Sequence, residues 1–329
     1  MIAAVHFSER RHAWAVDLGG TNTKLGVVDD SGRVVVQEAF STCPGRGGDS
    51  WAEEAAEALR GAAARGGVEA DRIGAVGVGA PGPLNVEAGV LTNPLPNLPG
   101  WQGFPICRAL ANRCGKPAFL DNDANVAALA EHWVGAGRGV DNLVVLTLGT
   151  GIGSGIIADG RLLHGMSDNA GELGHLSINY RGPRCVCGNR GCIELYASAP
   201  ALVRLFKQKL RRRECAARKG RSVTAEAIFE AAREGDPLAR EALEEVGRYL
   251  GMAVASIVHA LNPQIVILAG GLAGAAQFLL DPLREVVRER TYPDLQVGLR
   301  IEASTLGAAS GLVGAARLAL REQSSQRWT

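Results

Sequence analysis

Apolar and polar residues alternate along the first forty residues, and turn residues interrupt the alternation twice. The alternation covers residues 13–17, resumes at 23–29 after Gly19-Gly20, and resumes again at 34–36 after Asp30-Ser31-Gly32. A period of two, broken by short segments of Gly, Asp and Ser, is typical of strands joined by tight turns. We therefore expect three consecutive strands in hairpin connection.

The same pattern returns at residues 143–163. An apolar run at 143–148 leads into a glycine turn at 149–155, and a second turn at Asp159-Gly160 precedes 161–163. Each hairpin opens one half of the chain and carries glycines at its first turn. Two structurally similar halves are the simplest interpretation of this repetition.

Segments with helical spacing alternate with short apolar runs in both halves. The expected helices are 51–65, 125–134, 199–214, 224–252 and 306–321, and the expected buried strands are 73–78, 118–120 and 265–269. Strands that alternate with helices predict the α/β class, with sheets covered by helices.

Composition and charge exclude several classes of protein. Hydrophobic residues make up 47% and charged residues 21% of the 329 residues, which is typical of globular proteins. The 35 Lys and Arg residues nearly cancel the 34 Asp and Glu residues, so no global positive field would attract nucleic acid or an anionic membrane. We interpret the basic stretch 207–221 as a solvated helix face and loop.

The N-terminus and the most apolar run argue against an export signal and a membrane anchor. Residues 1–11 are soon interrupted by Glu9, Arg10 and Arg11, and the apolar run 265–280 contains several glycines. That run also falls short of the ~20 apolar residues that a spanning helix needs. We therefore expect a cytoplasmic protein.

The first glycine turn has the composition of an anion-binding loop. Gly19 and Gly20 let backbone N–H groups approach a phosphate without obstruction by a Cβ atom. Thr21 adds a hydroxyl, Lys24 adds a cation, and Asp17 can hold Mg²⁺ through water. The Gly-Lys-Ser/Thr step of a Walker A loop is missing. The alternative interpretation is an ordinary hairpin turn.

The second glycine turn, Gly149-Thr150-Gly151, is a weak signal by itself. A dinucleotide-binding fingerprint would require a helix next, whereas a strand pattern follows here. Paired with the first turn, it would hold the other side of a polyphosphate. Gly270-Gly271 ends the apolar run 265–269 and suits the adenosine part of a nucleotide, although a helix N-terminus packed on a sheet explains it equally well.

The segment Asp121-Asn122-Asp123 stands between a strand pattern and a helix pattern. Ligands of α/β sheets gather at such strand ends. Transfer of a phosphoryl group to an alcohol needs a carboxylate that accepts the hydroxyl proton, and Asp123 fits that role. The alternative is helix capping, for which Asp and Asn are favoured. Both roles can coexist if Asp121 or Asn122 serves as the cap.

Three of the seven cysteines cluster shortly after a histidine. The expected ligands of a metal ion are His175, Cys185, Cys187 and Cys192. Three thiolates and one imidazole form a closed tetrahedral set, which indicates structural rather than catalytic zinc. Zinc would fix His175 and, with it, Glu172 and Glu194, whose carboxylates can accept hydrogen bonds from sugar hydroxyls. Three free thiols in a loop are the alternative.

Taken together, these motifs resemble the ROK family (repressors, open reading frames and sugar kinases), and most closely its bacterial glucokinases. Residues 17–21 are similar to the family's first phosphate motif and 148–151 to its second. Residues 171–175 followed by 185–192 are similar to its signature and zinc knuckle. The resemblance spans residues 13–315.

The resemblance implies the actin-like ATPase/hexokinase (ribonuclease H-like) fold, with two α/β domains around a cleft. We expect a small N-terminal domain at residues 1–120 and a large domain at 121–329, with the C-terminal helix packing back on the small domain. The family also implies assembly as a homodimer or homotetramer.

The resemblance further implies ATP-dependent phosphorylation of a hexose at its 6-hydroxyl, with glucose as the expected substrate, ATP and Mg²⁺ as cofactors and Zn²⁺ in a structural role. Asp123 would be the base, and His175 would bind zinc through one ring nitrogen and face the sugar with the other. The expected sugar contacts are Asn97, Asn122, Asp123, Glu172, His175 and Glu194. The expected nucleotide contacts are Asp17, Gly19, Gly20, Thr21, Asn22, Lys24, Gly149, Thr150, Gly151, Gly270 and Gly271.

Two alternatives lie within the family. A kinase for N-acetylglucosamine, N-acetylmannosamine, mannose, fructose or allose would differ in the side chains near Glu172 and Glu194. A sugar-sensing repressor would carry a helix-turn-helix domain ahead of the first phosphate motif, where about a dozen residues precede Trp14. The sequence leaves open whether polyphosphate or ADP replaces ATP as the donor.

Overall fold

The computed structural model describes residues 11–212 and 223–325, and its contacts divide the chain into two compact units. The first unit contains the chain up to Val134, the short segment Gly165–Asn169 and the chain from Ala309 onward. The second unit contains Gly135–His164 and Ala170–Ala308. Residues 1–10, on which the expectation about an export signal rests, and residues 213–222, which include most of the basic stretch 207–221, lie outside the described residues.

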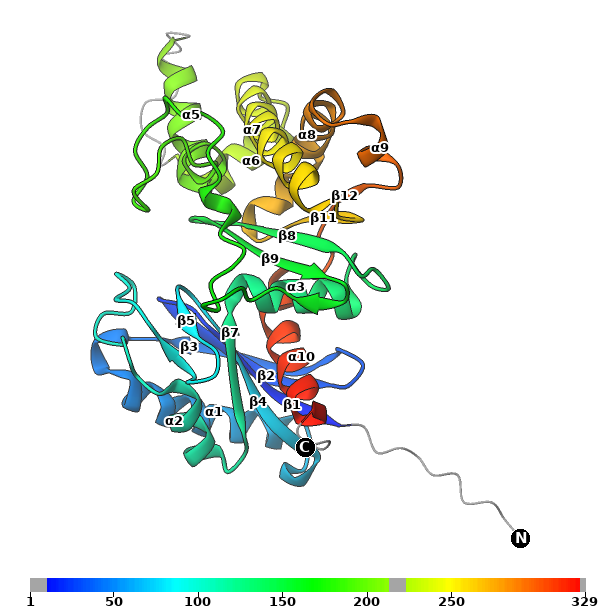
Figure 1. Ribbon diagram of the computed structural model, residues 1–329. Coiled ribbons are helices and arrows are strands. Elements are labelled where there is room, and N and C mark those ends of the chain that lie inside the picture. The colour runs from blue at the N-terminus through cyan, green and yellow to red at the C-terminus, as the bar shows by residue number, and fades with distance from the viewer. Residues whose placement is uncertain (1–10, 213–222, 326–329) are drawn as a thin grey trace. The chain divides into compact units, whose positions relative to one another are not determined.

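The first unit is built on a five-stranded sheet in the order β3-β2-β1-β4-β7 (Figure 1). The strands are β1 (His12–Leu18), β2 (Asn22–Asp29), β3 (Val34–Ser41), β4 (Ile73–Ala80) and β7 (Ala118–Asn122). The first three are antiparallel neighbours, whereas β1, β4 and β7 run parallel. This arrangement confirms the predicted hairpins and the predicted strands that follow them.

The second unit repeats this topology in a sheet of order β10-β9-β8-β11-β12. Its strands are β8 (Leu143–Leu148), β9 (Ile152–Ala158), β10 (Arg161–Leu162), β11 (Ile265–Ala269) and β12 (Arg300–Ala303). Again the hairpin strands are antiparallel, and β8, β11 and β12 run parallel. The two halves are therefore structurally similar, as the repeated hairpin pattern predicted.

Alternate residues of β1 serve two different cores, because successive side chains of a strand point to opposite faces. Trp14 and Val16 pack with α1 (Gly48–Arg65) and α2 (Ile106–Cys114), whereas Ala13 and Ala15 pack with α10 (Ser310–Ser325). Figure 1 shows these helices on the two faces of the sheet. The sheet of the first unit is thus covered on both faces.

Helix α10 lies close to β4 and α3 because a glycine stands at each contact, one on β4 and one on the helix itself. A Cβ atom at Gly77 in β4 would collide with the carbonyl oxygen of Ala315, and a Cβ atom at Gly314 would collide with the carbonyl oxygen of Val126 in α3 (Asp123–Val134). We expected the C-terminal helix to pack on the first domain. In the structure, α10 packs on β1 and β4. The contacts assign α3 to the first unit, whereas the expected boundary after residue 120 assigned it to the second.

Helices cover one face of the second sheet, where Val144, Leu146 and Leu148 of β8 enter a large apolar core. The larger helices are α5 (Ala199–Arg212), α6 (Ala225–Arg233), α7 (Pro237–Leu261) and α8 (Ala276–Arg290). Helices α7 and α8 approach closely at Gly247, where a Cβ atom would lie 2.5 Å from the carbonyl oxygen of Leu279.

Several elements differ from the sequence-based expectation. The helical stretch 224–252 is interrupted, because Gly235 has a φ of 97° and Asp236 caps α7 by accepting from the N–H groups of Leu238 and Ala239. Helix α7 then continues to Leu261. The elements that the sequence analysis did not identify are α2, α4 (Glu194–Ala197), α8, α9 (Pro293–Gln296), β5 (Leu84–Asn85), β6 (Val90–Leu91) and β12.

Among the described residues, the helices are too short or too polar to cross a membrane.

The close contact between α10 and α3 yields a test of packing. We expect Gly314→Ala to lower the free energy of unfolding by about 1–3 kcal/mol, because the added methyl group overpacks a backbone contact. Gly61→Ala in α1 is the matched control, since its Cβ atom would meet the flexible guanidinium of Arg65 at 3.0 Å. Chemical denaturation should show the control as stable as the parent protein or more stable, and equal stability of both variants would contradict the packing argument.

Candidate functional site

The carboxyl ends of β1, β4 and β7 meet at one edge of the first sheet. Asp17 is the register partner of Gly79, and Gly79 is the register partner of Asp121. Neighbouring strands are about 4.8 Å apart, so the first glycine turn and the segment that contains Asp123 share this edge. The structure therefore brings together two of the motifs on which the sequence analysis depends.

A chain of hydrogen bonds through buried hydroxyl groups supports the first glycine turn. The Trp51 indole N–H donates to Thr23 Oγ1 at 2.9 Å, and Thr23 Oγ1 lies 3.0 Å from Thr42 Oγ1. Thr42 Oγ1 donates in turn to the carbonyl oxygen of Gly19 at 2.6 Å. This support was not predicted from the sequence, because β2 also contains other polar residues, such as Asn22 and Lys24, and Thr23 does not stand out among them. Thr21 is exposed at the turn.

Asp17 stands beside the turn in a half-buried position. Burial raises the pKa of its carboxyl group, and the Lys24 ammonium, 3.9 Å away, acts in the opposite direction. The carboxylate also lies against the first turn of α10, where a Cβ atom at Gly311 would be 2.7 Å from Asp17 Oδ2. A glycine at 311 is therefore required for the observed position of Asp17.

The loop that contains Asn97 packs on the same turn. A Cβ atom at Gly20 would lie 2.6 Å from Asn97 Cβ and 2.7 Å from Asn97 Nδ2. Asn97 and Asn22 are both exposed. The structure thus places Asn97, a predicted sugar contact, directly beside the first glycine turn.

The three polar residues at the end of β7 divide their roles. Asp121 is fully buried, and its Oδ1 accepts from Asn125 Nδ2 at 2.8 Å. Asn122 Oδ1 accepts from the N–H group of Ala124 at 2.8 Å, which is the contact of a helix N-cap. The side chain of Asp123 is exposed at the first residue of α3. Asp123 Oδ1 also accepts from the Ala124 N–H group at 2.8 Å, and its carboxylate lies at the surface, where a substrate can reach it.

The second glycine turn is compact and lies next to Gly270. The Gly149 N–H group donates to the carbonyl oxygen of Gly151 at 2.9 Å. Gly270 has a φ of 84°, and a Cβ atom there would lie 2.6 Å from the carbonyl oxygen of Leu148. Thr150 and Gly271 are exposed. Two of the predicted nucleotide-binding segments are therefore adjacent in the second unit.

The predicted metal ligands converge on one point. The donor atoms of His175, Cys185, Cys187 and Cys192 all lie within 4.8 Å of one another. His175 Nδ1 is 3.6 Å from Cys185 Sγ, and Cys187 Sγ is 3.6 Å from Cys192 Sγ. Tetrahedral zinc with its usual bond lengths would separate such donors by about 3.6–3.8 Å. The four residues therefore fit a zinc ion, with Nδ1 as the donor atom of the histidine.

Two glycines allow the chain to turn around this cluster. Gly188 and Gly191 have φ values of 92° and 67°, and a Cβ atom at Gly191 would collide with the carbonyl oxygen of Asn179. Burial raises the pKa of the Cys192 thiol to about 12, whereas the Asn189 N–H group lowers the pKa of Cys187. Ligation of a metal would therefore have to displace the proton of Cys192.

The two glutamates of the second unit occupy different surroundings. Glu172 is largely exposed, and its Oε2 lies 3.8 Å from His175 Nε2, the ring nitrogen that does not face the cysteines. Glu194 is half-buried, and its Oε2 accepts from the N–H group of Ile152 at 3.0 Å. Ser154, which the sequence analysis did not single out, accepts from the Leu173 N–H group at 3.1 Å and so anchors the segment next to Glu172.

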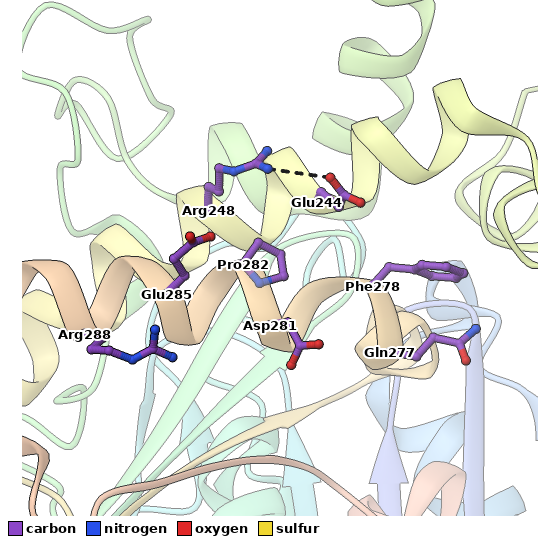
Figure 2. A pocket seen from close by; sticks show the side chains of 8 residues that line it. All are labelled: Glu244, Arg248, Gln277, Phe278, Asp281, Pro282, Glu285 and Arg288. Atoms are coloured by element: carbon purple, nitrogen blue, oxygen red, sulfur yellow. Dashed lines mark ion pairs between the residues drawn. The ribbon is translucent and has the colours of Figure 1, made fainter.

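A cleft of about 420 Å³ lies elsewhere on the second unit, between side chains of α7 and α8 (Figure 2). Glu244 and Arg248 on α7 form an ion pair at 3.6 Å, and the remaining side chains come from α8. The cleft is lined by Glu244, Arg248, Gln277, Phe278, Asp281, Pro282, Glu285 and Arg288. This set contains none of the residues predicted to bind sugar, nucleotide or zinc.

The chain is similar to known proteins over most of its length. The model of the ROK family matches residues 13–322. The chain is 37% identical over 308 residues to a glucokinase of Thermotoga maritima, covering 92% of this chain and 95% of that protein. It is 34% identical over 254 residues to a xylose repressor of Caldicellulosiruptor bescii, covering 76% of this chain and 63% of the repressor.

A solved structure is similar over nearly the whole chain. It is a ROK family glucokinase from Streptomyces griseus in complex with glucose and AMPPNP, with a TM-score of 0.80 and 34% identity, covering 95% of this chain and 99% of that one. The fold is accordingly of the actin-like ATPase/hexokinase type, as predicted. With a family model that spans most of its length and relatives of this similarity, the chain belongs to the ROK family.

Proposed function

We propose that the protein transfers the γ-phosphoryl group of MgATP to the 6-hydroxyl of glucose. The observation that carries the proposal is the Asp123 carboxylate, exposed at the carboxyl edge of the first sheet together with the first glycine turn. Similarity to the glucokinase of Thermotoga maritima and to the Streptomyces griseus enzyme, whose structure contains glucose and AMPPNP, supports the choice of substrates.

The chemistry needs positioning and charge stabilisation more than covalent catalysis. Asp123 accepts the proton of the sugar hydroxyl and orients its oxygen. Backbone N–H groups of the two glycine turns, such as those of Gly20 and Gly151, hold phosphate oxygens, and Asp17 would hold Mg²⁺. Mg²⁺, when bound, neutralises the charge of the transferred phosphoryl group.

Carboxylates and an imidazole of the second unit supply the sugar contacts in this proposal. Glu172 and Glu194 accept hydrogen bonds from sugar hydroxyls, and the Nε2 side of His175 faces a hydroxyl while Nδ1 binds a structural zinc ion. The distances within the Cys₃His cluster support this division of the two ring nitrogens. Zinc would fix the backbone around His175 and so keep the neighbouring Glu172 in place.

The remaining expectations stay predictions. They are phosphorylation of glucose rather than another hexose, ATP rather than polyphosphate as donor, a homodimer or homotetramer, and a cytoplasmic location.

An ADP-release assay with glucose, mannose, fructose, allose and the two N-acetylhexosamines tests which sugar is the substrate. Consumption of ATP with none of these sugars would overturn the proposed function.

Removal of the base gives the most direct test of the mechanism. We expect Asp123→Asn to lower kcat by about 10²–10⁴-fold, the usual range for general acid–base catalysis, with folding unchanged. Asp71→Asn is the matched control, because Asp71 is exposed just before β4, at the opposite edge of the same sheet. Steady-state kinetics that show equal kcat for Asp123→Asn and the parent protein would remove Asp123 from the mechanism.

Asp17 offers a test that separates stability from activity. The raised pKa of its carboxyl means that the folded state disfavours the charge, so the carboxylate costs stability at neutral pH. We expect Asp17→Asn to raise Tm at pH 7 while it abolishes activity. The gain in Tm should vanish below the ordinary pKa of 3.8, where the Asp17 carboxyl is protonated in both folded and unfolded protein. A lower Tm at pH 7 would contradict this reading of Asp17.

The zinc cluster is tested by removing one thiolate. We expect Cys187→Ala to lose bound zinc and to unfold at a lower temperature, because binding of a structural metal contributes to folding. Cys43→Ala is the matched control, since Cys43 is also exposed but lies outside the cluster. Metal analysis that finds full zinc occupancy in Cys187→Ala would exclude Cys187 as a ligand.

A further inference from the structure

One residue, Ile152, joins the second glycine turn to both segments that carry the sugar-binding carboxylates. It directly follows Gly149-Thr150-Gly151, and its N–H group donates to Glu194 Oε2 at 3.0 Å. On its other side, the carbonyl oxygen of Ile152 is so close to Gly174 that a Cβ atom there would collide with it. The start of β9 is thus in contact with the neighbourhoods of both Glu172 and Glu194.

The contact between Glu194 and the turn itself is equally close. A Cβ atom at Gly151 would lie 2.5 Å from Glu194 Oε2, the same oxygen that accepts from Ile152. The carbonyl oxygen of Gly149 accepts from the N–H group of Ala199, two residues beyond α4, at 2.8 Å. The turn is therefore fastened to the segment 194–199 at both of its ends.

A carboxylate has two oxygens and can accept several hydrogen bonds at once. Glu194 Oε2 is engaged by the turn, and a sugar hydroxyl donating to the same carboxylate would fix its orientation further. The charge on Glu194 also strengthens its bond to Ile152, because hydrogen bonds to ionised acceptors are stronger than neutral ones. Any ligand that orients this carboxylate thereby orients the turn.

We propose that Glu194 is a positioning residue for the phosphate turn as well as a sugar contact, and that it couples the two substrate sites. This inference rests on the proposed function for its sugar half. Coupling between two binding sites is reciprocal, so the nucleotide held by the turn should favour sugar binding as much as the sugar favours the nucleotide. Sugar and nucleotide would then bind with positive cooperativity.

The first experiment measures binding of MgADP in the absence of sugar by isothermal titration calorimetry. We expect Glu194→Ala to weaken MgADP binding roughly fivefold or more, the lower range of measured couplings between sites. Glu194→Gln should bind MgADP nearly as the parent protein does, because its amide oxygen can still accept from Ile152. If Glu194 were only a sugar contact, the parent protein and both variants would bind MgADP with equal affinity. That result would overturn the proposal.

The second experiment uses two glycines of the second unit, one inside the turn and one outside it, and measures binding of glucose without nucleotide. Gly151→Ala should weaken glucose binding because its methyl group displaces the Glu194 carboxylate. Gly274→Ala is the matched control, since Gly274 lies outside this turn and a Cβ atom there meets nothing within 4 Å. Equal glucose affinity of the two variants would show that the turn does not act on the sugar site.

The experiments distinguish failure of the proposed function from failure of the proposed coupling through Glu194. If the parent protein binds MgADP but not glucose, the proposed substrate is wrong, and the contrast between Glu194→Ala and Glu194→Gln still decides the role of Glu194. Thermal unfolding adds a readout that needs no ligand. The decrease in Tm caused by Gly151→Ala should be smaller in the Glu194→Ala background, where no carboxylate stands in the way of the methyl group; an undiminished decrease would count against the contact.

Discussion

The parallel register of β1, β4 and β7 is the constraint on which the first half of the site depends. It fixes Asp17, Gly79 and Asp121 in one row across the sheet, so Asp17 and the segment that carries the proposed base cannot move apart unless strands unpair. Some other contacts at this end of the strands are made between residues close together in the sequence. Asn122 makes one of them when it caps α3, and the Asp123 side chain next to it is exposed.

The two units reach a similar loop geometry by different means. In the first unit, the buried hydroxyls of Thr23 and Thr42 support the glycine turn from within the core. In the second unit, the charged side chain of Glu194 performs the comparable function. A common strand order therefore does not require common supporting contacts, because buried hydroxyls support one turn and a half-buried carboxylate supports the other.

The sequence predicted what depends on neighbours in the chain. Alternation identified both hairpins, and the spacing of His175 and the cysteines identified a cluster whose donor atoms do converge. What it could not predict depends on residues far apart in the chain. The support of Gly19 by Thr42 and the contact of Gly311 with Asp17 arise only when strands and helices pack.

Helix α10 has a consequence for the order in which the protein is completed during synthesis. Leu312, Ala315 and Ala319 of this helix pack with Ala13 and Ala15, and the helix contacts the glycine-lined part of β4, although the ribosome makes it after the whole second unit. One face of the N-terminal sheet thus lacks the cover of α10 while the intervening second unit is being translated. During that interval this face exposes apolar surface, which makes an incompletely folded chain prone to aggregation.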